Sequence, residues 1–367
     1  MKKTLLITLE YPPMVGGVAH YYQNIVEQLP QSDIFVLDNN KHELLSPHAW
    51  VWPKWLPGVI NSYRAIKKYN FEHILVGQVL PIGTIALIMK LLTPIQYTVM
   101  THAMDITTPT GPEGNVLKKW LMKRILRHAF RVTTVSSYTR NKLEELGVPS
   151  KKIVTVYPCP HLDGTHISPS KEEMENLDTS YSLHNKRVVL SVGRLVQRKG
   201  FDRTLEAFAQ VAPDHKNTNY AIVGEGPYKD DLLHIAKTLG IENRVQFTGS
   251  IDNKELAQWY LRCELFLMPS RELDNNDVEG FGTVFLEANS FGKPVIGGKS
   301  GGISDAVVDG ETGYLVDPTD VTMIATAMNR LLNEESTAIQ LGHQGFKRVQ
   351  DIFQWKQQAK KIKDILS

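Results

Sequence analysis

The chain contains the stretch Pro269-Ser270-Arg271-Glu272-Leu273-Asp274-Asn275-Asn276-Asp277-Val278-Glu279-Gly280-Phe281-Gly282-Thr283-Val284-Phe285-Leu286-Glu287-Ala288, which joins an expected strand to an expected helix. The apolar run Leu265–Met268 predicts a buried strand, and Thr283–Ser290 predicts the first turns of a helix. Ligands of open α/β sheets bind beyond the carboxyl ends of strands, where a helix N-terminus offers unpaired N–H groups. The acidic, glycine-containing loop between the two elements is therefore a candidate ligand site.

Two glutamates and two glycines give this loop its chemistry. Gly280 and Gly282 lack a Cβ atom and let the backbone approach a ligand closely. Glu279 stands on the loop and Glu287 follows on the helix, so the two carboxylates can bracket a polyhydroxylated ligand. The alternative is that the glycines only form a turn and that Glu287 is solvated, because most charged side chains are exposed.

Length and composition indicate a globular protein of two domains. The chain has 367 residues, of which 42% are hydrophobic and 22% charged, and it is too long for one ordinary core. Its 41 basic and 39 acidic side chains nearly balance, so no nucleic-acid partner is expected. The cysteines, Cys159 and Cys263, are too few for a metal cluster and do not suggest a disulfide framework, which favours a reducing cytoplasm.

No segment predicts a signal peptide or a membrane span. The apolar run at the N-terminus stops at Leu9 and meets Glu10, so it predicts a first strand. The best candidate for a span, Ile82–Leu92, is too short and is interrupted by Lys90. We therefore expect a cytoplasmic protein that does not cross the membrane.

Short apolar runs alternate with helical patterns in two successive sets, which predicts parallel strands with crossover helices. The expected strands of the first set are Thr4–Leu9, Ile34–Leu37, His73–Gly77, Tyr97–Thr101, Val132–Ser136 and Ile153–Tyr157. Those of the second set are Val188–Val192, Tyr220–Val223, Val245–Thr248, Leu265–Met268, Pro294–Ile296 and Tyr314–Val316. We expect Rossmann-like domains over residues 1–160 and 187–350, a linker over 161–186 and a last helix over 351–367.

Two loops of the first domain carry candidate ligand residues at strand ends. Gly16-Gly17 follows the first strand, although paired glycines often only form a tight turn and the G-x-G-x-x-G pattern of dinucleotide sites is absent. His102 and Asp105 follow the expected strand Tyr97–Thr101. A lone histidine is more often structural, but its place at a strand tip makes His102 a candidate.

The second domain begins with a basic glycine loop, Gly193–Gly200, directly after its first strand. From there Arg194 can offer a planar guanidinium fork to a diphosphate, and Lys199 can offer a point charge. The alternative is that both are ordinary solvated cations. Gly224 belongs to another glycine turn at a strand end, for which a purely structural role is an equal alternative.

Four motifs in this order resemble those of retaining glycosyltransferases with the GT-B fold, in glycosyltransferase family four. They are the Gly16-Gly17 loop, H-x-x-D at His102–Asp105, G-R-x-x-x-x-K-G at Gly193–Gly200 and E-x7-E at Glu279–Glu287. The longer segment Asp277–Ala288 looks most like the phosphatidylinositol mannosyltransferase branch. The resemblance covers nearly the whole chain and implies two Rossmann-like domains facing each other across a cleft. It also implies that the last helix, 351–367, crosses back to the N-terminal domain.

The chain departs from that family in two places. Glu272–Asp277 forms an extended acidic insert, which is expected to alter how the donor or the acceptor fits into the site. Ala103 follows His102 where many relatives carry Gly.

The same resemblance implies roles for individual residues. Arg194 and Lys199 bind the leaving diphosphate, Glu279 and His102 contact the donor sugar, and Glu287 binds the ribose hydroxyls. The other donor-binding residues that it implies are Gly16, Gly17, Asp105, Gly193, Gly224, Ile251, Phe281, Gly282, Thr283 and Val284. Because two cations can stabilise the leaving group, no metal ion and no cofactor is expected.

Two segments combine basic with apolar or aromatic residues. They are residues 50–68, with Trp50, Trp52 and Trp55 before Arg64, Lys67 and Lys68, and residues 116–131, which are basic on one side and apolar on the other at helical period. The segments predict peripheral contact with an anionic membrane at its inner face. The alternative for 116–131 is a core-facing helix with a solvated basic face.

The residues and the resemblance together predict a retaining, metal-independent hexosyltransferase of cell-envelope polysaccharide or glycolipid synthesis. The implied donor is GDP-mannose, and the implied acceptor, bound by the N-terminal domain, is lipid-linked or a glycan. The alternatives are a UDP-sugar-dependent transferase with glucose, GlcNAc or galactose as its sugar, a GT-B sugar-nucleotide epimerase, and a silent sugar-nucleotide-binding protein.

Overall fold

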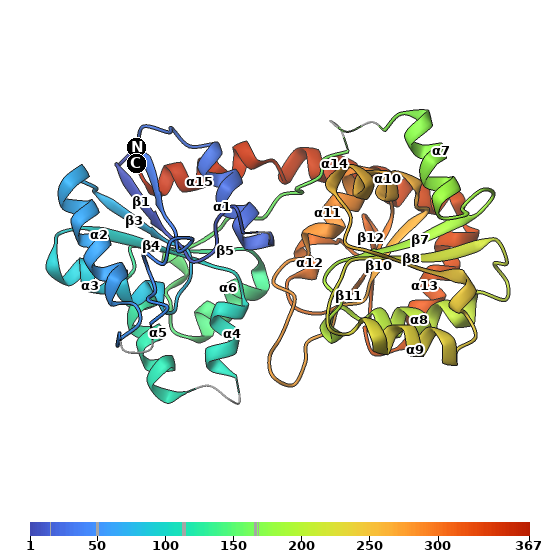
Figure 1. The fold of residues 1–367 in the computed structure, drawn as a ribbon, viewed down its shortest axis with the longest axis horizontal. Helices are drawn as coiled ribbons and strands as arrows, with labels where there is room; N and C mark the ends of the chain where they lie inside the picture. Colours follow the sequence, from blue (N-terminus) through green and yellow to red (C-terminus); the bar gives the residue numbers. More distant parts are fainter. Residues whose placement is uncertain (15, 49–50, 112–114, 165–166, 168) are drawn as a thin grey trace. The chain divides into compact units, whose positions relative to one another are not determined.

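The computed structural model describes residues 1–14, 16–48, 51–111, 115–164, 167 and 169–367. It divides into two compact units (Figure 1). The first unit consists of Met1–Pro158, Asp274–Gly280 and Gln354–Ser367, and the second of Cys159–Leu273 and Phe281–Phe353.

The first unit contains a sheet of parallel strands in the order β2-β1-β3-β4-β5-β6. Its strands are β1 (Thr4–Ile7), β2 (Ile34–Leu37), β3 (His73–Val76), β4 (Gln96–Thr101), β5 (Arg131–Thr134) and β6 (Ile153–Thr155). Its helices are α1 (Gly17–Glu27), α2 (Leu56–Tyr69), α3 (Ile82–Leu92), α4 (Met104–Thr110), α5 (Val116–His128), α6 (Ser137–Glu145), the short η1 (Ser150–Lys152) and α15 (Trp355–Ile365). The expected strands are confirmed.

Both faces of this sheet are covered, which explains why its strands are apolar throughout rather than alternating. On β1, Leu5 and Ile7 belong to the core cluster that includes residues of α2, α3 and α5. Leu6 points to the opposite face and joins residues of α1 and α15, among them Tyr22 and Ile362. The last helix, α15, therefore packs on the sheet of the first unit.

The second unit also contains parallel strands, in the order β12-β11-β10-β7-β8-β9. They are β7 (Arg187–Val192), β8 (Thr218–Val223), β9 (Val245–Gly249), β10 (Leu265–Met268), β11 (Val295–Gly298) and β12 (Gly313–Val316). The helices are α7 (Lys171–Ser180), η2 (Gln197–Lys199), α8 (Phe201–Val211), α9 (Lys229–Thr238), η3 (Glu242–Arg244), α10 (Asn253–Arg262), α11 (Thr283–Ser290), α12 (Ile303–Ala306), α13 (Val321–Asn333) and α14 (Glu335–Ile352). Counted from β7, this is the strand order of the Rossmann fold.

Helices also cover both faces of the second sheet. Leu265 and Leu267 of β10 join the core formed with α8, α9 and α13. Phe266 between them faces the other way and makes an edge-to-face contact with Phe285 of α11, with ring centroids 5.4 Å apart. This contact anchors α11 directly behind the strand whose loop carries the acidic motif.

The segment 161–186, expected to be a linker, is part of the second unit instead. It contains α7, whose first turn has a capping box: the Ser170 hydroxyl accepts from the Glu173 amide, and the Glu173 carboxylate accepts from the Ser170 amide. Tyr181 after the helix donates to Glu255 of α10 at 2.8 Å. The Ser-x-x-Glu pattern was a readable helix signal that the composition-based interpretation overlooked.

The acidic insert is divided between the units, because Asp274–Gly280 groups with the first one. Gly280 lies against the backbone of that unit, since a Cβ atom on it would sit 2.8 Å from the carbonyl oxygen of His102. Glu279 therefore belongs to the first unit, whereas Phe281 and α11 belong to the second.

None of the helices in the described ranges combines the length and the apolar character that a bilayer span requires.

Candidate functional site

Each sheet has a point where the strand order reverses, and ligands of open α/β sheets bind beyond the strands at such points. In the second unit this point lies between β7 and β10, which pair with each other. The loop after β7 carries the basic motif, and the loop after β10 carries the acidic motif. The topology thus brings the two strongest sequence motifs of this unit to one edge.

Lys199 ends a short turn after β7 and is largely enclosed, with a relative exposure of 8%. Its side chain folds back toward Gly193. A Cβ atom placed on Gly193 would lie 3.6 Å from the Lys199 Cε atom. Arg194 on the same loop is exposed. A largely enclosed lysine beside an exposed arginine is an arrangement suited to a polyanion.

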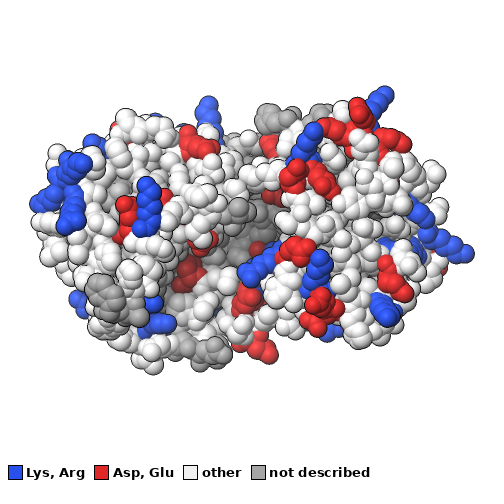
Figure 2. Space-filling view, viewed as in Figure 1, with Lys and Arg blue, Asp and Glu red and all other residues white. Residues whose placement is uncertain are grey.

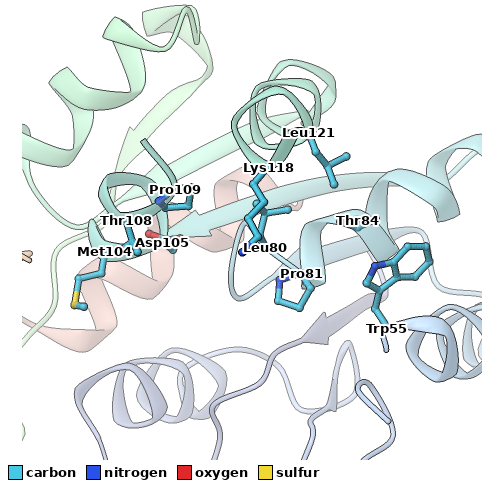
Figure 3. Close-up of a pocket in the computed structure, with 10 residues that line it drawn as sticks. All are labelled: Trp55, Leu80, Pro81, Thr84, Met104, Asp105, Thr108, Pro109, Lys118 and Leu121. Atoms are coloured by element: carbon cyan, nitrogen blue, oxygen red, sulfur yellow. The ribbon is translucent and has the colours of Figure 1, made fainter. Parts of the chain in front are cut away.

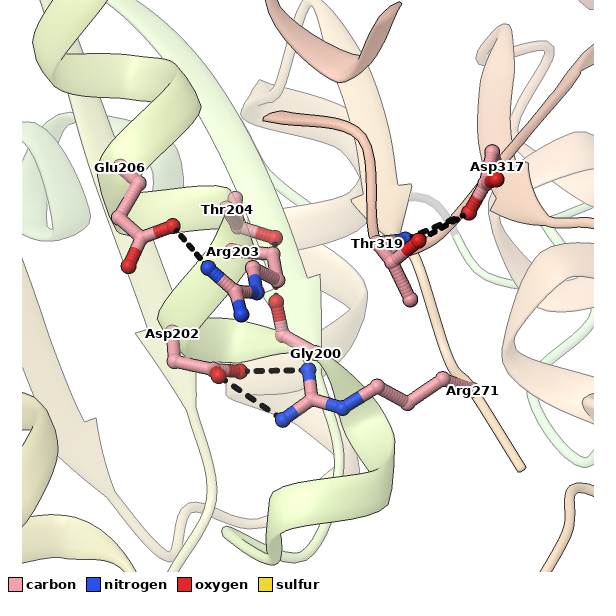
Figure 4. Close-up of polar contacts among 8 residues, drawn as sticks. All are labelled: Gly200, Asp202, Arg203, Thr204, Glu206, Arg271, Asp317 and Thr319. Atoms are coloured by element: carbon pink, nitrogen blue, oxygen red, sulfur yellow. Dashed lines mark hydrogen bonds and ion pairs between the residues drawn. The ribbon is translucent and has the colours of Figure 1, made fainter. Parts of the chain in front are cut away.

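A buried ion pair attaches this basic loop to the loop after β10 (Figure 4). Arg271 donates from both terminal nitrogens to Asp202 at the start of α8, at 2.9 and 2.8 Å, and both side chains are 11% exposed. The Arg271 amide also donates to the Arg198 carbonyl at 2.8 Å. Two independent contacts thus fix the backbone on either side of Lys199.

Gly200 makes this attachment sterically possible. Its φ is +77°, in the left-handed region, and a Cβ atom on it would lie 2.2 Å from the Pro269 carbonyl oxygen. No other residue type fits here without moving the loop after β10. The glycine of the basic motif is therefore explained by packing alone.

Backbone contacts join the ends of β7, β8 and β9. The Gly193 amide donates to the Val223 carbonyl at 3.0 Å, and the Gly224 amide donates to the Gly249 carbonyl at 2.9 Å. Gly224 has φ +135°, and a Cβ atom on it would overlap the Gly193 carbonyl oxygen. Gly224 is thus required by close packing, and Ile251 follows this layer and is half-buried.

The N-terminus of α11 has no side-chain cap. Gly282 precedes the helix with φ +91° and has no side chain, so it cannot supply a capping oxygen. Thr283 and Val284 form the first turn. The first amides of a helix have no partners within it and attract anions. Phe281, by contrast, is 3% exposed and faces Phe353 at 5.7 Å, so only its backbone remains suited to a ligand.

Glu287 lies inside the second unit rather than on a solvated helix face, with an exposure of 7%. One carboxylate oxygen accepts from the Tyr260 hydroxyl at 2.8 Å, and the other accepts from the His161 amide at 3.4 Å. Burial raises the pKa of Glu287, while Tyr260, His161 and the positive charge of Lys199 act to lower it. The charge of Lys199 thus acts on the Glu287 carboxyl, which is consistent with a shared site.

His102 of the first unit is held by aromatic neighbours. Its Nε2 atom lies 2.6 Å from the Tyr22 hydroxyl, and the ring meets those of Tyr21 and Tyr22 edge-on at 5.0 and 5.2 Å. Tyr22 donates its hydroxyl proton to the Gly77 carbonyl. The proton in the hydrogen bond between Tyr22 and His102 therefore belongs to Nε2 of the histidine, and Nδ1 is the ring nitrogen that can accept. Burial lowers the pKa of His102 to about 4, so the ring is neutral.

Asp105 lies one turn after His102 at the start of α4. Its Oδ1 atom accepts from the His102 amide at 2.9 Å, whereas Oδ2 is enclosed and has no hydrogen-bond partner among the described residues. Burial raises the pKa of Asp105 to about 7, and the charge of Glu10 adds to the effect. The intervening Ala103 has φ +76°, a conformation that suits the glycine of many relatives better.

The environment of Asp105 predicts a pH-dependent stability effect. Between pH 4 and 7 the folded state keeps the proton that the unfolded chain loses, so stability falls as the pH rises through this window. The variant Asp105→Asn lacks this penalty and is expected to gain roughly 1–3 kcal/mol at pH 8. At pH 4 the gain vanishes. Thermal unfolding at both pH values checks this, and a pH-independent difference would refute it.

Gly16 and Gly17 form the entry to α1 after β1. A Cβ atom on either would meet no described atom within 4 Å. The protein's own packing therefore does not explain these glycines, in contrast to Gly200 and Gly224. Open space beside them is compatible with close approach of a ligand.

Several residues of the two sites were missed by reasoning from the sequence. Tyr22, Tyr260, Asp202 and Arg271 position predicted residues, and Gln78 accepts from the Leu9 amide beside Glu10 at 3.0 Å. Tyr22 and Tyr260 are buried residues of helices, and the sequence does not distinguish them from ordinary aromatic core residues. Arg271 stood within the quoted stretch, but its partner lies 69 residues away.

The two basic segments differ from ordinary amphipathic helices. On α5, Met122, Ile125 and Leu126 are buried, but Val116, Leu117 and Trp120 are 84%, 69% and 54% exposed. In the other segment Trp52 is 86% exposed, and Trp50 lies outside the described residues. Figure 2 shows Lys and Arg grouped over the end of the first unit that carries α2. Apolar and basic side chains are thus exposed together.

Two family profiles match the chain. The one described as Glycosyltransferase Family 4 covers residues 15–163, and the one described as Glycosyl transferases group 1 covers residues 174–348.

Curated relatives match over all or much of the chain. The GDP-mannose-dependent alpha-(1-6)-phosphatidylinositol monomannoside mannosyltransferase of Mycolicibacterium smegmatis is 29% identical over 381 residues, covering 99% of this chain and 98% of the relative. The N-acetyl-alpha-D-glucosaminyl L-malate synthase of Bacillus anthracis is 30% identical over 254 residues, covering 69% and 62%.

A solved structure shares the fold at low sequence identity. Anabaena Alr3699/HepE in complex with UDP and glucose has a TM-score of 0.79 at 19% identity, covering 100% of this chain and 99% of that one. A second, sucrose-phosphate synthase from Thermosynechococcus elongatus, has a TM-score of 0.81 at 22% identity, covering 100% and 98%. The expected GT-B fold of two Rossmann-like domains is confirmed.

Proposed function

The chain belongs to the family-four glycosyltransferases, and we propose that it moves mannose from GDP-mannose to a lipid-linked or glycan acceptor with retention of anomeric configuration. The observation that carries the proposal is the edge of the second unit where enclosed Lys199, exposed Arg194 and the uncapped start of α11 occur together. These groups all favour a polyanion, and Glu287 beside Lys199 suits ribose hydroxyls.

The reaction breaks the bond between the sugar C1 and the β-phosphate oxygen, and negative charge then grows on the diphosphate. Arg194, Lys199 and the α11 dipole would stabilise that charge. Because these groups can neutralise the leaving group, we propose that no divalent ion takes part.

Retention follows if the acceptor hydroxyl attacks C1 from the face that the diphosphate leaves. Its proton would pass to the departing phosphate oxygen, so that one C–O bond breaks and one forms without a protein nucleophile. Glu279 and the Nδ1 atom of neutral His102 would hold the sugar hydroxyls.

The donor assignment is supported by the relative whose name specifies GDP-mannose and whose match spans both chains. The UDP complex of Anabaena Alr3699/HepE favours a UDP-sugar as the second candidate. The acceptor and a peripheral membrane location are supported by the exposed apolar and basic side chains of α5.

A panel of GDP-, UDP- and ADP-sugars in thermal unfolding, without added metal, tests the donor. A ligand at 100 times its Kd stabilises the folded state by about 2.7 kcal/mol, so the preferred donor should raise the Tm visibly. We expect a selective rise with GDP-mannose. A selective rise with a UDP-sugar would contradict the mannose assignment, and no response to any donor would contradict the site.

A further inference from the structure

Tyr260 of α10 contacts the carboxylate of Glu287, and the proposed chemistry gives this tyrosine no part. Its hydroxyl donates to the Oε2 atom of Glu287 at 2.8 Å, and the residue is 0% exposed. The ring is stacked on Phe291, with centroids 5.6 Å apart and planes 15° from parallel, and it lies 6.0 Å from the ring of Phe266. Because aromatic neighbours enclose the ring, its hydroxyl is held in one place.

A second segment reaches the other oxygen of the same carboxylate. The His161 amide donates to the Oε1 atom of Glu287 at 3.4 Å. The segment is attached further along α11, where the Gly164 amide donates to the Ser290 hydroxyl at 3.0 Å. A Cβ atom on Gly164 would lie 2.5 Å from the Ser290 carbonyl oxygen, so the two backbones are in close contact. The protein thus supplies one donor to each oxygen of Glu287.

Each oxygen of Glu287 keeps one further site at which it can accept a hydrogen bond. An ionised carboxylate can accept about four hydrogen bonds, two at each oxygen. Tyr260 occupies one site on Oε2, and His161 occupies one site on Oε1. A vicinal diol presents two hydroxyl donors on neighbouring carbons, so it matches the two remaining sites with one hydroxyl per oxygen.

A buried carboxyl group of the first unit differs from Glu287 in its donors. Asp105 lies in the wall of a cavity of about 590 Å³ (Figure 3), and its Oδ2 atom has no hydrogen-bond partner among the described residues. Burial raises the pKa of Asp105 to about 7. Burial also raises the pKa of Glu287, but the hydrogen bond from Tyr260 is the largest effect that lowers it. Tyr260 is therefore suited to keep Glu287 in its ionised, accepting form.

We propose that Tyr260 is a positioning residue, which orients the Glu287 carboxylate so that each of its oxygens accepts one hydroxyl of the donor ribose. The inference rests on the proposed function and deepens it, because it gives both ribose hydroxyls a share of the affinity and gives the tyrosine a role without contact to the donor. Burial and the negative charge of Glu287 raise the pKa of Tyr260, so the phenol remains a hydrogen-bond donor at neutral and mildly acidic pH.

GDP and its 2′-deoxy and 3′-deoxy forms test this geometry on the unaltered protein by isothermal titration calorimetry. A hydrogen bond to a charged group is worth roughly tenfold or more in affinity. We expect each deoxy form to bind about tenfold more weakly than GDP, by similar factors. Full affinity of either deoxy form would overturn the proposal, because one oxygen of Glu287 would then have no ribose hydroxyl to accept.

The variant Tyr260→Phe keeps the ring and removes the hydroxyl. We expect GDP to bind about tenfold more weakly at pH 8, and the KM for GDP-mannose to rise similarly at nearly constant kcat. The loss should be larger at pH 5.5, because the pKa of Glu287 rises when this donor is removed. Tyr181→Phe is the matched control: its hydroxyl donates to Glu255 of the same α10 at 2.8 Å, and its loss should leave GDP binding unchanged. An equal loss at both pH values would assign Tyr260 to packing instead.

A double-mutant cycle tests whether Tyr260 acts through Glu287. Glu287→Gln removes the charge, so adding Tyr260→Phe to it should weaken GDP binding by less than about twofold, against about tenfold in the wild-type protein. Equal costs in both backgrounds would refute the positioning role. If Tyr260→Phe does not fold, the deoxy series on the wild-type protein still decides the proposal.

UDP separates this inference from the donor assignment, because it carries the same ribose. A protein that binds UDP and not GDP would contradict the mannose donor, and the same series with UDP and its deoxy forms would then decide the role of Tyr260. Binding of neither nucleotide would overturn both proposals.

Discussion

Replacing Lys199 with alanine is expected to lower the rate of sugar transfer by about 100-fold or more while leaving the protein folded. Lys199 is 8% exposed, and its ammonium lies close to Gly193, on the loop that also carries Arg194. Removing one group that stabilises a developing negative charge typically costs about 100- to 1,000-fold in kcat. Product formation from the best donor of the panel measures the effect.

The matched control for this change is Lys237→Ala, which removes an exposed lysine of α9. Its kcat and Tm should equal those of the wild-type protein. Lys199→Ala should keep its Tm within a few degrees, because the side chain is not part of the apolar core. A Lys199→Ala protein that turns over at the wild-type rate would refute the assignment of this residue to the diphosphate.

Replacing Arg271 with alanine is expected to lower both stability and kcat. The change leaves the Asp202 carboxylate without its two charged donors, at a site where both side chains are 11% exposed. Breaking a buried pair from one side costs about 3–5 kcal/mol, and the slight exposure here suggests the lower part of that range. The loop that holds Lys199 then loses one of its two attachments, so kcat should fall about tenfold.

A double variant separates positioning from stability alone. Asp202→Leu/Arg271→Leu removes both charges, and such replacements often restore stability. We expect its Tm to recover and its kcat to stay low. Arg203→Ala, which breaks the partly exposed pair with Glu206 on the same helix (Figure 4), should change neither. Recovery of kcat together with Tm would show that the pair has no role in positioning Lys199.

Much of the fold could be predicted because its signals are local. The apolar runs marked every strand, and Thr283–Ser290 matches α11 residue for residue. Gly282, with φ +91°, shows why a glycine stands before that helix. The alternation of strand and helix was enough to give two Rossmann-like domains, since parallel sheets covered on both faces need apolar strands throughout.

What escaped prediction depends on contacts between distant residues. The pairing of Asp202 with Arg271 joins two loops, and neither charge differs in sequence from a solvated one. The grouping of Asp274–Gly280 with the first unit follows from packing of Gly280 on the His102 backbone, which no local pattern encodes. The sequence alone does not decide whether Glu287 is solvated or buried. Its burial depends on the contact with Tyr260, which lies 27 residues earlier in the chain.

The most direct test of the proposed chemistry is a proton NMR time course of GDP-mannose with the protein in EDTA, using water as the acceptor. We predict that GDP and free mannose form together and that α-mannose is the first anomer to appear, before mutarotation mixes the two. Lys199→Ala should release neither at a measurable rate. Initial formation of β-mannose would contradict retention, and the absence of release until a divalent metal is added would contradict the role given to Arg194 and Lys199.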